Sequence, residues 1–286
     1  MGAVSTAFVN KFKDNIIQLV QQKGTKLRPS VMVDTDFNSE FKYYDQLGKT
    51  NMVQRVSRHQ ATPDIDPDHK RRRLAKIDWV HNVLFDTQDQ LRMIVDPKSA
   101  YATSASWSAG RKMDDRIINA YNSTAYAGKA GGTATSFDAN FQIAHGGAGL
   151  TKAKLLEAKE LLDNQDVEDE DRYCVCTPAQ ITDLLNLSEV TSSDYNSVKA
   201  LVQGEIDSWL GFKFIRISSQ RLGTDGTSRL IYCYHKAAIQ LGISREPTVR
   251  IDQRPDLMYA WQVYLEMTIG ATRLEEERIV QIACNE

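Results

Sequence analysis

The chain has 286 residues, which is enough for one large domain or two modest ones. Hydrophobic residues make up 42% and charged residues 25%, as in ordinary globular proteins. With 35 Lys and Arg against 37 Asp and Glu, the formal charge is −2, which excludes an isolated, strongly basic DNA-binding domain. No apolar run approaches the ~20 residues that a membrane-spanning helix needs.

The cysteines and the N-terminus bear on the compartment in which the chain works. Four cysteines without a secretory signal predict free thiols in a reducing compartment. Residues 1–6 fit the short myristoylation pattern, but small residues after an initiator Met are common, so we favour a plain N-terminus. No charged segment followed by an apolar one opens the chain, so no export leader is expected.

Residues 7–23 predict a short amphipathic helix. Phe8, Phe12 and Ile16 recur there at helical spacing, with lysines between them. Gly24 ends the pattern. The apolar face of such a short helix needs to be covered, so a helix that lies outside the core is expected to contact another surface.

Residues 51–78 predict a long polar hairpin that projects from the chain. It follows a mixed, aromatic and extended stretch at 31–50. We expect a strand at 52–56, a Pro- and Asp-rich turn at 62–68, and a returning limb at 70–77. The hairpin has too few apolar residues to form a core of its own, so it must lie on something else.

The longest predicted helix covers residues 98–126. It begins after Asp96-Pro97, and proline is tolerated near a first helical turn. Gly110 costs the helix about 1 kcal/mol, so its presence suggests tight packing against a close neighbour. The predicted buried stripe is Ala102, Ser106, Ala109, Met113, Ile117 and Ala120.

The remainder of the chain reads as a glycine-rich connection followed by mixed helix and strand. Six glycines at 128–149 indicate a flexible connection. The expected helices are 154–162, 178–185 and 195–204, and the expected strands are 172–176, 212–217, 229–234, 249–251, 261–269 and 278–282.

Two sequence motifs of known enzyme classes are present only in part, and each lacks a glycine that the motif requires. Residues 48–50 resemble the end of a phosphate-binding loop, but Tyr43 stands where that loop needs glycine. Ser108 and Gly110 form half of a nucleophile elbow, whose first glycine is replaced by Ser106. No enzyme is therefore predicted.

Candidate metal ligands and acid pairs fail as well. The aspartates at 64–68 imitate the start of a calcium loop, but His69 replaces its glycine. Asp114 and Asp115 would point about 100° apart on a helix and cannot share a proton. Cys174 and Cys176 would lie about 6–7 Å apart on one face of a strand, which favours buried thiols over a metal site. No metal or cofactor is predicted.

The basic run at 70–76 leaves three interpretations open. It can contact another subunit, form a solvated face, or touch nucleic acid. The acidic run at 166–171 is a candidate counterpart. Contact between subunits and a solvated loop are favoured over nucleic acid.

Several segments taken together resemble the major capsid proteins of tailed bacteriophages, which have the Hong Kong 97 type fold. The likeness covers about residues 80–286 and rests on the order and spacing of the segments. They are Asp96–Ala102, Gly110–Ala120, the strand and Pro-started helix at 172–185, Glu205–Phe212, and the segment from Gly270 to Ile282.

The resemblance implies an α+β fold with an N-terminal arm, an extended hairpin loop, a peripheral domain with a long spine helix, and an axial domain. The implied division is 1–50 for the arm, 51–78 for the hairpin loop, 79–144 for the peripheral domain with its spine helix at 98–126, 145–260 for the axial domain, and 261–286 for the returning strands of the peripheral domain.

The function implied by the resemblance is that of a major capsid protein. Such a subunit self-assembles into hexamers and pentamers of an icosahedral head around double-stranded DNA. Implied partners are further copies of the chain, a separate scaffolding protein, a portal protein, a cement protein in some heads, and DNA bound without sequence specificity. The expected location is the virion, after assembly in the host cytoplasm, with no membrane involved.

The expected intersubunit contacts come from the two projecting elements and the basic run. They are Arg55, Arg58, Lys70, Arg71, Arg72, Arg73, Lys76, Phe8 and Phe12. The alternatives to a phage head are an encapsulin-type nanocompartment around a protein cargo and a cytosolic α/β enzyme.

Overall fold

The computed structural model describes residues 21–62, 64–86, 98–186 and 208–286. The chain divides into two compact units. Unit 1 comprises Met1–Thr25, Asp78–Lys112 and Arg245–Thr268, and unit 2 comprises Lys26–Ile77, Met113–Ser244 and Ile269–Glu286. The predicted helix at 195–204 and most of the one at 7–23 lie outside the described residues, and residues 21–23 are not helical.

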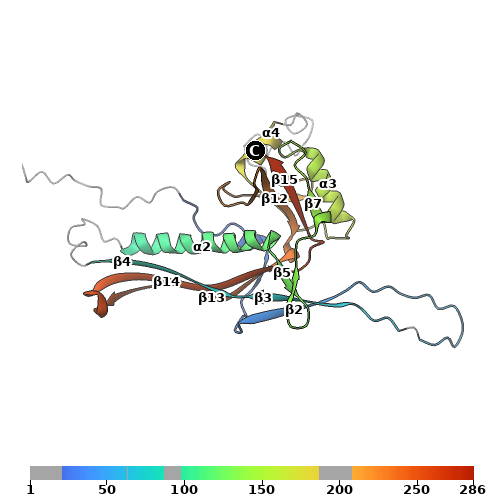
Figure 1. Ribbon diagram of the computed structural model, residues 1–286, viewed down its shortest axis with the longest axis horizontal. Coiled ribbons are helices and arrows are strands. Elements are labelled where there is room, and N and C mark those ends of the chain that lie inside the picture. Colours follow the sequence, from blue (N-terminus) through green and yellow to red (C-terminus); the bar gives the residue numbers. More distant parts are fainter. Residues whose placement is uncertain (1–20, 63, 87–97, 187–207) are drawn as a thin grey trace, which may run out of the picture. The chain divides into compact units, whose positions relative to one another are not determined.

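Unit 1 is built from a long helix beside long strands. These elements are α2 (Lys98–Asn122), β4 (Ile77–Phe85), β13 (Ile239–Arg254) and β14 (Ala260–Arg273), and each of them has residues in unit 2 as well. Helix α2 lies along β4 (Figure 1), where Lys112 Nζ is 3.9 Å from the centre of the Trp79 ring and the tilted rings of Phe85 and Tyr101 have their centres 5.8 Å apart. The strand order of this sheet is β1-β13-β14-β4, with β1 at Met32–Asp34.

Helix α2 ends four residues earlier than its sequence pattern predicts. The chain turns after Asn122 and begins a short strand at Ala125, because the backbone there pairs with neighbouring strands. The buried stripe follows the prediction at Ala109, Met113, Ile117 and Ala120. Ser106 is exposed and Ala105 is buried in its place.

Unit 2 contains a seven-stranded sheet with the order β7-β15-β12-β8-β10-β9, and β11 pairs with β12. Helices α3 and α4 lie beside it (Figure 1). The Tyr121 ring of α2 stacks on that of Tyr232 at 4.7 Å and lies tilted against that of Tyr234 at 4.9 Å, so this part of α2 covers one face of the sheet. The bounds are β7 Gln142–Ile143, α3 Lys152–Asp163, β8 Arg172–Cys176, α4 Pro178–Leu185, β9 Ser208–Trp209, β10 Phe212–Arg216, β11 Thr224–Asp225, β12 Ser228–His235 and β15 Ile279–Asn285.

A second sheet of unit 2 has the order β2-β3-β5-β6. Its strands are β2 (Phe41–Leu47), β3 (His69–Ala75), β5 (Ala125–Ala127) and β6 (Thr133–Thr135).

Short 3-10 turns of three residues each occur in both units, at Arg28–Ser30, Ala139–Phe141, Lys236–Ala238 and Pro255–Leu257.

The hairpin is confirmed as an antiparallel pair, but its strands lie closer to its base than expected. Strands β2 and β3 pair in register from Phe41–Ala75 to Leu47–His69. The strand expected at 52–56 is wrong: among the described residues no strand pairs with that segment, and a strand needs a neighbour for its backbone hydrogen bonds. The segment at 128–149, expected as a flexible connection, contains the short strands β6 and β7.

Candidate intersubunit surface

The register of β2 with β3 divides the basic run between two faces of a sheet. Successive side chains of a strand point to opposite faces. Arg71 and Arg73 therefore share one face with their partners Asp45 and Tyr43. Arg72 lies on the other face.

Arg72 is held inside its own subunit. The side chain is buried; its Nε donates to the backbone oxygen of Leu274 at 3.0 Å and its Nη2 to Glu276 Oε1 at 3.1 Å. These bonds tie β3 to the turn between β14 and β15. We therefore leave Arg72 out of the surface offered to other subunits, because its charge is matched within the chain.

Arg71 and Arg73 form a face on which cations alternate with aromatic rings. The Arg73 guanidinium lies 4.7 Å from the ring centre of Phe41 and 4.5 Å from that of Tyr126. Arg71 lies 5.6 Å from the Tyr43 ring and forms an ion pair with Asp45. A hydrogen bond from the Arg71 side chain lowers the pKa of the Asp45 carboxyl. We call Phe41, Tyr43, Arg71, Arg73 and Tyr126 the cation–aromatic face.

The two lysines of the basic set, Lys70 and Lys76, lie near the two ends of strand β3. Lys70 is exposed, opposite Gln46 in the ladder. Lys76 is half-buried, with its Nζ 5.7 Å from the centre of the Phe37 ring. Both amines remain near the surface of unit 2.

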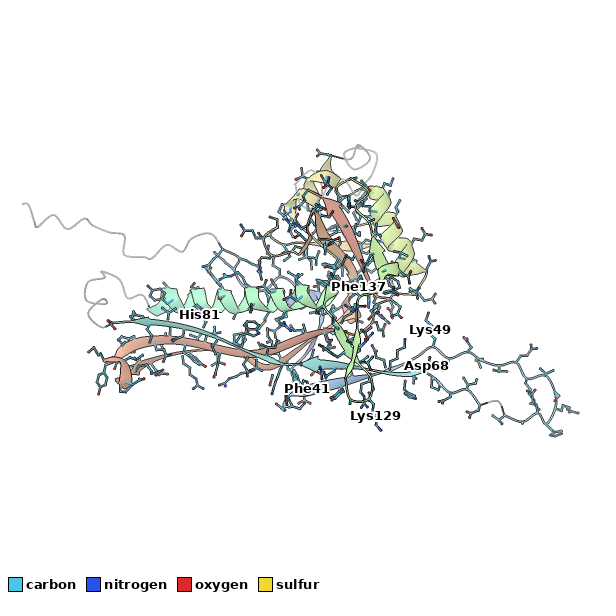
Figure 2. All side chains as sticks on the ribbon, viewed as in Figure 1. Phe41, Lys49, Asp68, His81, Lys129 and Phe137 are labelled. Atoms are coloured by element: carbon cyan, nitrogen blue, oxygen red, sulfur yellow. The ribbon has the colours of Figure 1, made fainter. Side chains whose placement is uncertain are left out.

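Residues 48–68 form a loop beyond the paired strands, which we call the arm loop. Figure 2 labels Lys49 and Asp68 where its two limbs leave the β2–β3 ladder, and Gly48 N donates to Asp68 O at 2.7 Å at its base. Arg55 and Arg58 are both exposed on the loop. It contains no helix or strand among its described residues.

The arm loop exposes apolar side chains to an unusual degree. Met52 is 100% exposed, Val56 is 82% exposed and Val53 is 56% exposed. Single exposed apolar residues are common on protein surfaces, but three in five residues without cover are typical of an interaction site. Within the described part of this subunit, these three side chains have little apolar cover.

The acidic run at 166–171 is partly matched by charges of its own chain. Lys49 Nζ lies 3.1 Å from Asp166 Oδ2, but both side chains are largely exposed. Arg278 pairs with Glu168, and Lys213 pairs with Asp171. Contact with the basic run at 70–76 is not among the ion pairs of the described residues.

Phe8 and Phe12 lie outside the described residues. Within the part that the structure describes, no group of three or more His, Cys, Asp or Glu side chains could hold a metal ion. No described helix is long and apolar enough to cross a membrane.

The comparison with protein families decides what kind of protein this is. A model of phage capsid proteins matches residues 4–286. The chain belongs to the phage capsid protein family. This capsid protein is thus a major structural subunit of a phage head and a component of the virion, and it self-associates into a shell.

Solved structures agree on the fold of this capsid protein. The capsid of cyanophage P-SCSP1u matches with a TM-score of 0.77 at 14% identity, covering 99% of this chain and 94% of that one. The capsid of a native GTA particle matches with 0.73 at 13%, covering 99% and 98%. The capsid of Ralstonia phage GP4 matches with 0.73 at 9%, covering 96% and 94%. No curated protein sequence matches the chain significantly.

The family match and these structures confirm the expected Hong Kong 97 type fold of mixed helix and sheet. They give no support to a nanocompartment shell or to a cytosolic α/β enzyme. The family is structural, in keeping with the interaction surfaces described above.

Proposed function

We propose that this capsid protein assembles into hexamers and pentamers of an icosahedral head that encloses double-stranded DNA. The observation that carries the proposal is the arm loop at 48–68. It presents Met52, Val53 and Val56 to solvent although its ladder is firmly paired at the base. A neighbouring subunit would bury these side chains.

The arm loop lies over an adjacent subunit in this proposal. Burial of apolar surface contributes about 25 cal/mol per Å², so each covered side chain adds a modest amount. The many copies in a closed shell sum such weak contacts into a stable particle. Arg55 and Arg58 add charge contacts that fix the register of the loop on its neighbour.

The cation–aromatic face is the second proposed contact. Its arginines are held by rings of their own subunit, so little side-chain freedom is lost when a neighbour docks. Lys70, which lies on the other face of β3, and Lys76, which follows β3, are further proposed contacts. Phe8 and Phe12 of the arm at 1–50 cross to a neighbouring subunit.

The remaining segments have mechanical roles in the proposal. Helix α2 braces the peripheral domain, 79–144, together with the returning strands at 261–286. The axial domain, 145–260, meets its copies around the local symmetry axis. The proposed division follows the resemblance, and each role is a prediction about the assembled particle.

The proposed partners are a separate scaffolding protein, a portal protein and, in some heads, a cement protein. The head assembles in the host cytoplasm and holds DNA without sequence specificity. A chain of net charge −2 fits this role, because an enclosing shell does not need to bind DNA tightly. Catalysis is not part of the proposed role.

The test changes the apolar character of the arm loop and leaves β2 and β3 intact. In one variant Met52, Val53 and Val56 are all replaced by serine. We expect a folded subunit, shown by an unchanged circular dichroism spectrum and unfolding midpoint, that forms few or no shells in sedimentation and electron microscopy.

The matched control keeps the same positions apolar, with Met52→Leu, Val53→Ile and Val56→Leu. This variant should form shells in normal yield. If the serine variant assembles as well as the control, the arm loop does not carry the contact and the proposal loses its main support.

A further inference from the structure

The four cysteines of the chain lie on one face of the seven-stranded sheet. Cys174 and Cys176 are on β8, Cys233 is on β12 and Cys284 is on β15. All four are free thiols and all are fully buried. The strand registers place Cys174 directly opposite Cys233.

Two backbone hydrogen bonds establish how Cys174 and Cys233 face each other. Lys236 N donates to Asp171 O, and His235 N donates to Arg278 O, both at 3.1 Å. Amide directions alternate along a strand, so the N–H of Cys233 points to β15, as that of His235 does, and away from β8. Cys174 and Cys233 are therefore a non-hydrogen-bonded antiparallel pair.

This kind of pair has a Cα separation that a disulfide can span. Its Cα atoms are about 4.5 Å apart, and disulfides span Cα separations of about 4.4–6.8 Å. Cys176 is two residues along the same strand from Cys174, at about 6.5–7 Å, and lies one residue beyond the end of the β8–β12 ladder. Cys284 opposes Arg229. The register favours one pairing among the four thiols.

The reduced state of the pair is protected by its surroundings. The Cys176 thiol lowers the pKa of Cys174, but interaction with Cys233 and burial outweigh it and hold that pKa well above its ordinary value. Since the thiolate is the reactive form, both burial and the raised pKa slow oxidation. The pair should therefore stay reduced while a reducing system is present and oxidise slowly without one.

We infer that Cys174 and Cys233 are a site of reversible disulfide formation, with a low-molecular-weight disulfide as the oxidant. Because both sulfurs are buried, the reaction requires a local opening of the sheet, in which the thiolate of one cysteine attacks the small disulfide, forms a mixed disulfide and releases one small thiol. The second cysteine attacks the mixed disulfide, forms the Cys174–Cys233 bond and releases another small thiol. Two protein thiols are oxidised, one small disulfide is reduced, and the two protons pass to the released thiols.

The bond would fasten β8 to β12 in the middle of the sheet. It would also close the long stretch of chain between the two strands, and closure of a long segment restricts the unfolded chain most strongly. The oxidised subunit should thus resist unfolding better than the reduced one. The inference does not depend on shell assembly, because both strands belong to one subunit.

The test uses the purified full-length chain, assembled or not, incubated with oxidised glutathione and compared with a sample kept in dithiothreitol. We expect titratable thiols in denaturant to fall from four to two per chain. Peptide mapping by mass spectrometry should find one intrachain link, between Cys174 and Cys233. The thermal unfolding midpoint should rise by several degrees and return when dithiothreitol is added.

Cys284→Ala is the matched control and should keep the oxidant-dependent rise, whereas Cys233→Ala should lose it. If Cys233→Ala does not fold, the peptide map of the unaltered chain decides. Four thiols after prolonged exposure, a stable mixed disulfide, a link between chains or a different intrachain pair would each overturn the inference.

Discussion

Two residues of helix α2 hold the chain segment at 24–27, one in each unit. In unit 1, a Cβ atom added to Gly110 would lie 2.6 Å from Gly24 Cα. In unit 2, the buried Asp114 carboxylate accepts hydrogen bonds from Lys26 N at 3.0 and 3.1 Å and from Leu27 N at 3.1 Å. The glycine thus allows a close approach of backbones, and the carboxylate satisfies amides that would otherwise be buried without partners.

The substitution Gly110→Ala tests the close approach. Alanine improves helix propensity by about 1 kcal/mol, but overpacking against backbone costs typically 1–3 kcal/mol. We expect a net loss of up to about 2 kcal/mol in the free energy of unfolding, measured by urea denaturation of the unassembled subunit. Gly132→Ala is the control, because a Cβ there meets nothing within 4 Å. A Gly110→Ala subunit as stable as this control would show that the approach is not tight.

The Glu286 carboxylate gives the fold a predictable dependence on pH. Its Oε2 accepts from Arg229 Nε at 3.0 Å and Nη2 at 2.8 Å, and its Oε1 accepts from Gln180 Nε2 at 2.8 Å. The hydrogen bonds from Arg229 are the main cause that lowers the pKa of Glu286 below 4.5. A folded-state pKa below the unfolded one means that the stabilisation is complete above pH ~4.5 and is lost as the pH falls through the folded-state value.

We therefore expect Glu286→Gln to reduce the free energy of unfolding at pH 7 and to have a smaller effect at pH 3. Urea denaturation at a series of pH values, for both chains, measures the difference. The two curves should converge as the pH falls below about 4.5. Parallel curves over this range would show that the Glu286 charge does not contribute.

At the scale of elements, the basic side chains on the two faces of strand β3 make different contacts. Arg72 secures the strand to the turn after β14, whereas Arg71 and Arg73 shape the cation–aromatic face. A run of four basic residues in the sequence cannot reveal this division. The register with β2 determines which side chains are buried, and register depends on residues some thirty positions away.

The division predicts different effects for neighbouring substitutions. Arg72→Ala should cost on the order of 2 kcal/mol in the free energy of unfolding, because it leaves a half-buried carbonyl and a half-buried carboxylate less well satisfied. Arg71→Ala should leave subunit stability nearly unchanged, since its pair with Asp45 is exposed. Chemical denaturation of unassembled subunits gives both values. Equal losses for the two variants would contradict the assignment.

The sequence predicted best those elements whose signals are local. Strand β8 and helix α4 lie where expected, because a β-rich run is followed by Pro178 at the start of the helix and by a capping box formed by Thr177 and Gln180. Helix α3 begins after Thr151, whose side chain accepts from Lys154 N. The predictions that failed, the strand at 52–56 and the end of α2, depended on the presence or absence of distant pairing partners.

At the scale of the whole molecule, the order of elements carried more information than any single motif. The resemblance to phage capsid proteins rested on that order, and the family match over residues 4–286 confirms it. Structures at 9–14% identity keep the fold, so packing and topology persist where individual contact residues do not. The contact residues of the assembled head could for this reason be proposed from the sequence but not located by it.

The most direct test of the assembly proposal is electron microscopy of the full-length chain, expressed alone and with the neighbouring viral proteins. The proposal predicts uniform icosahedral shells, or hexameric and pentameric capsomers, under at least one of these conditions. Small asymmetric particles under both conditions, from a subunit that is folded by circular dichroism, would contradict it.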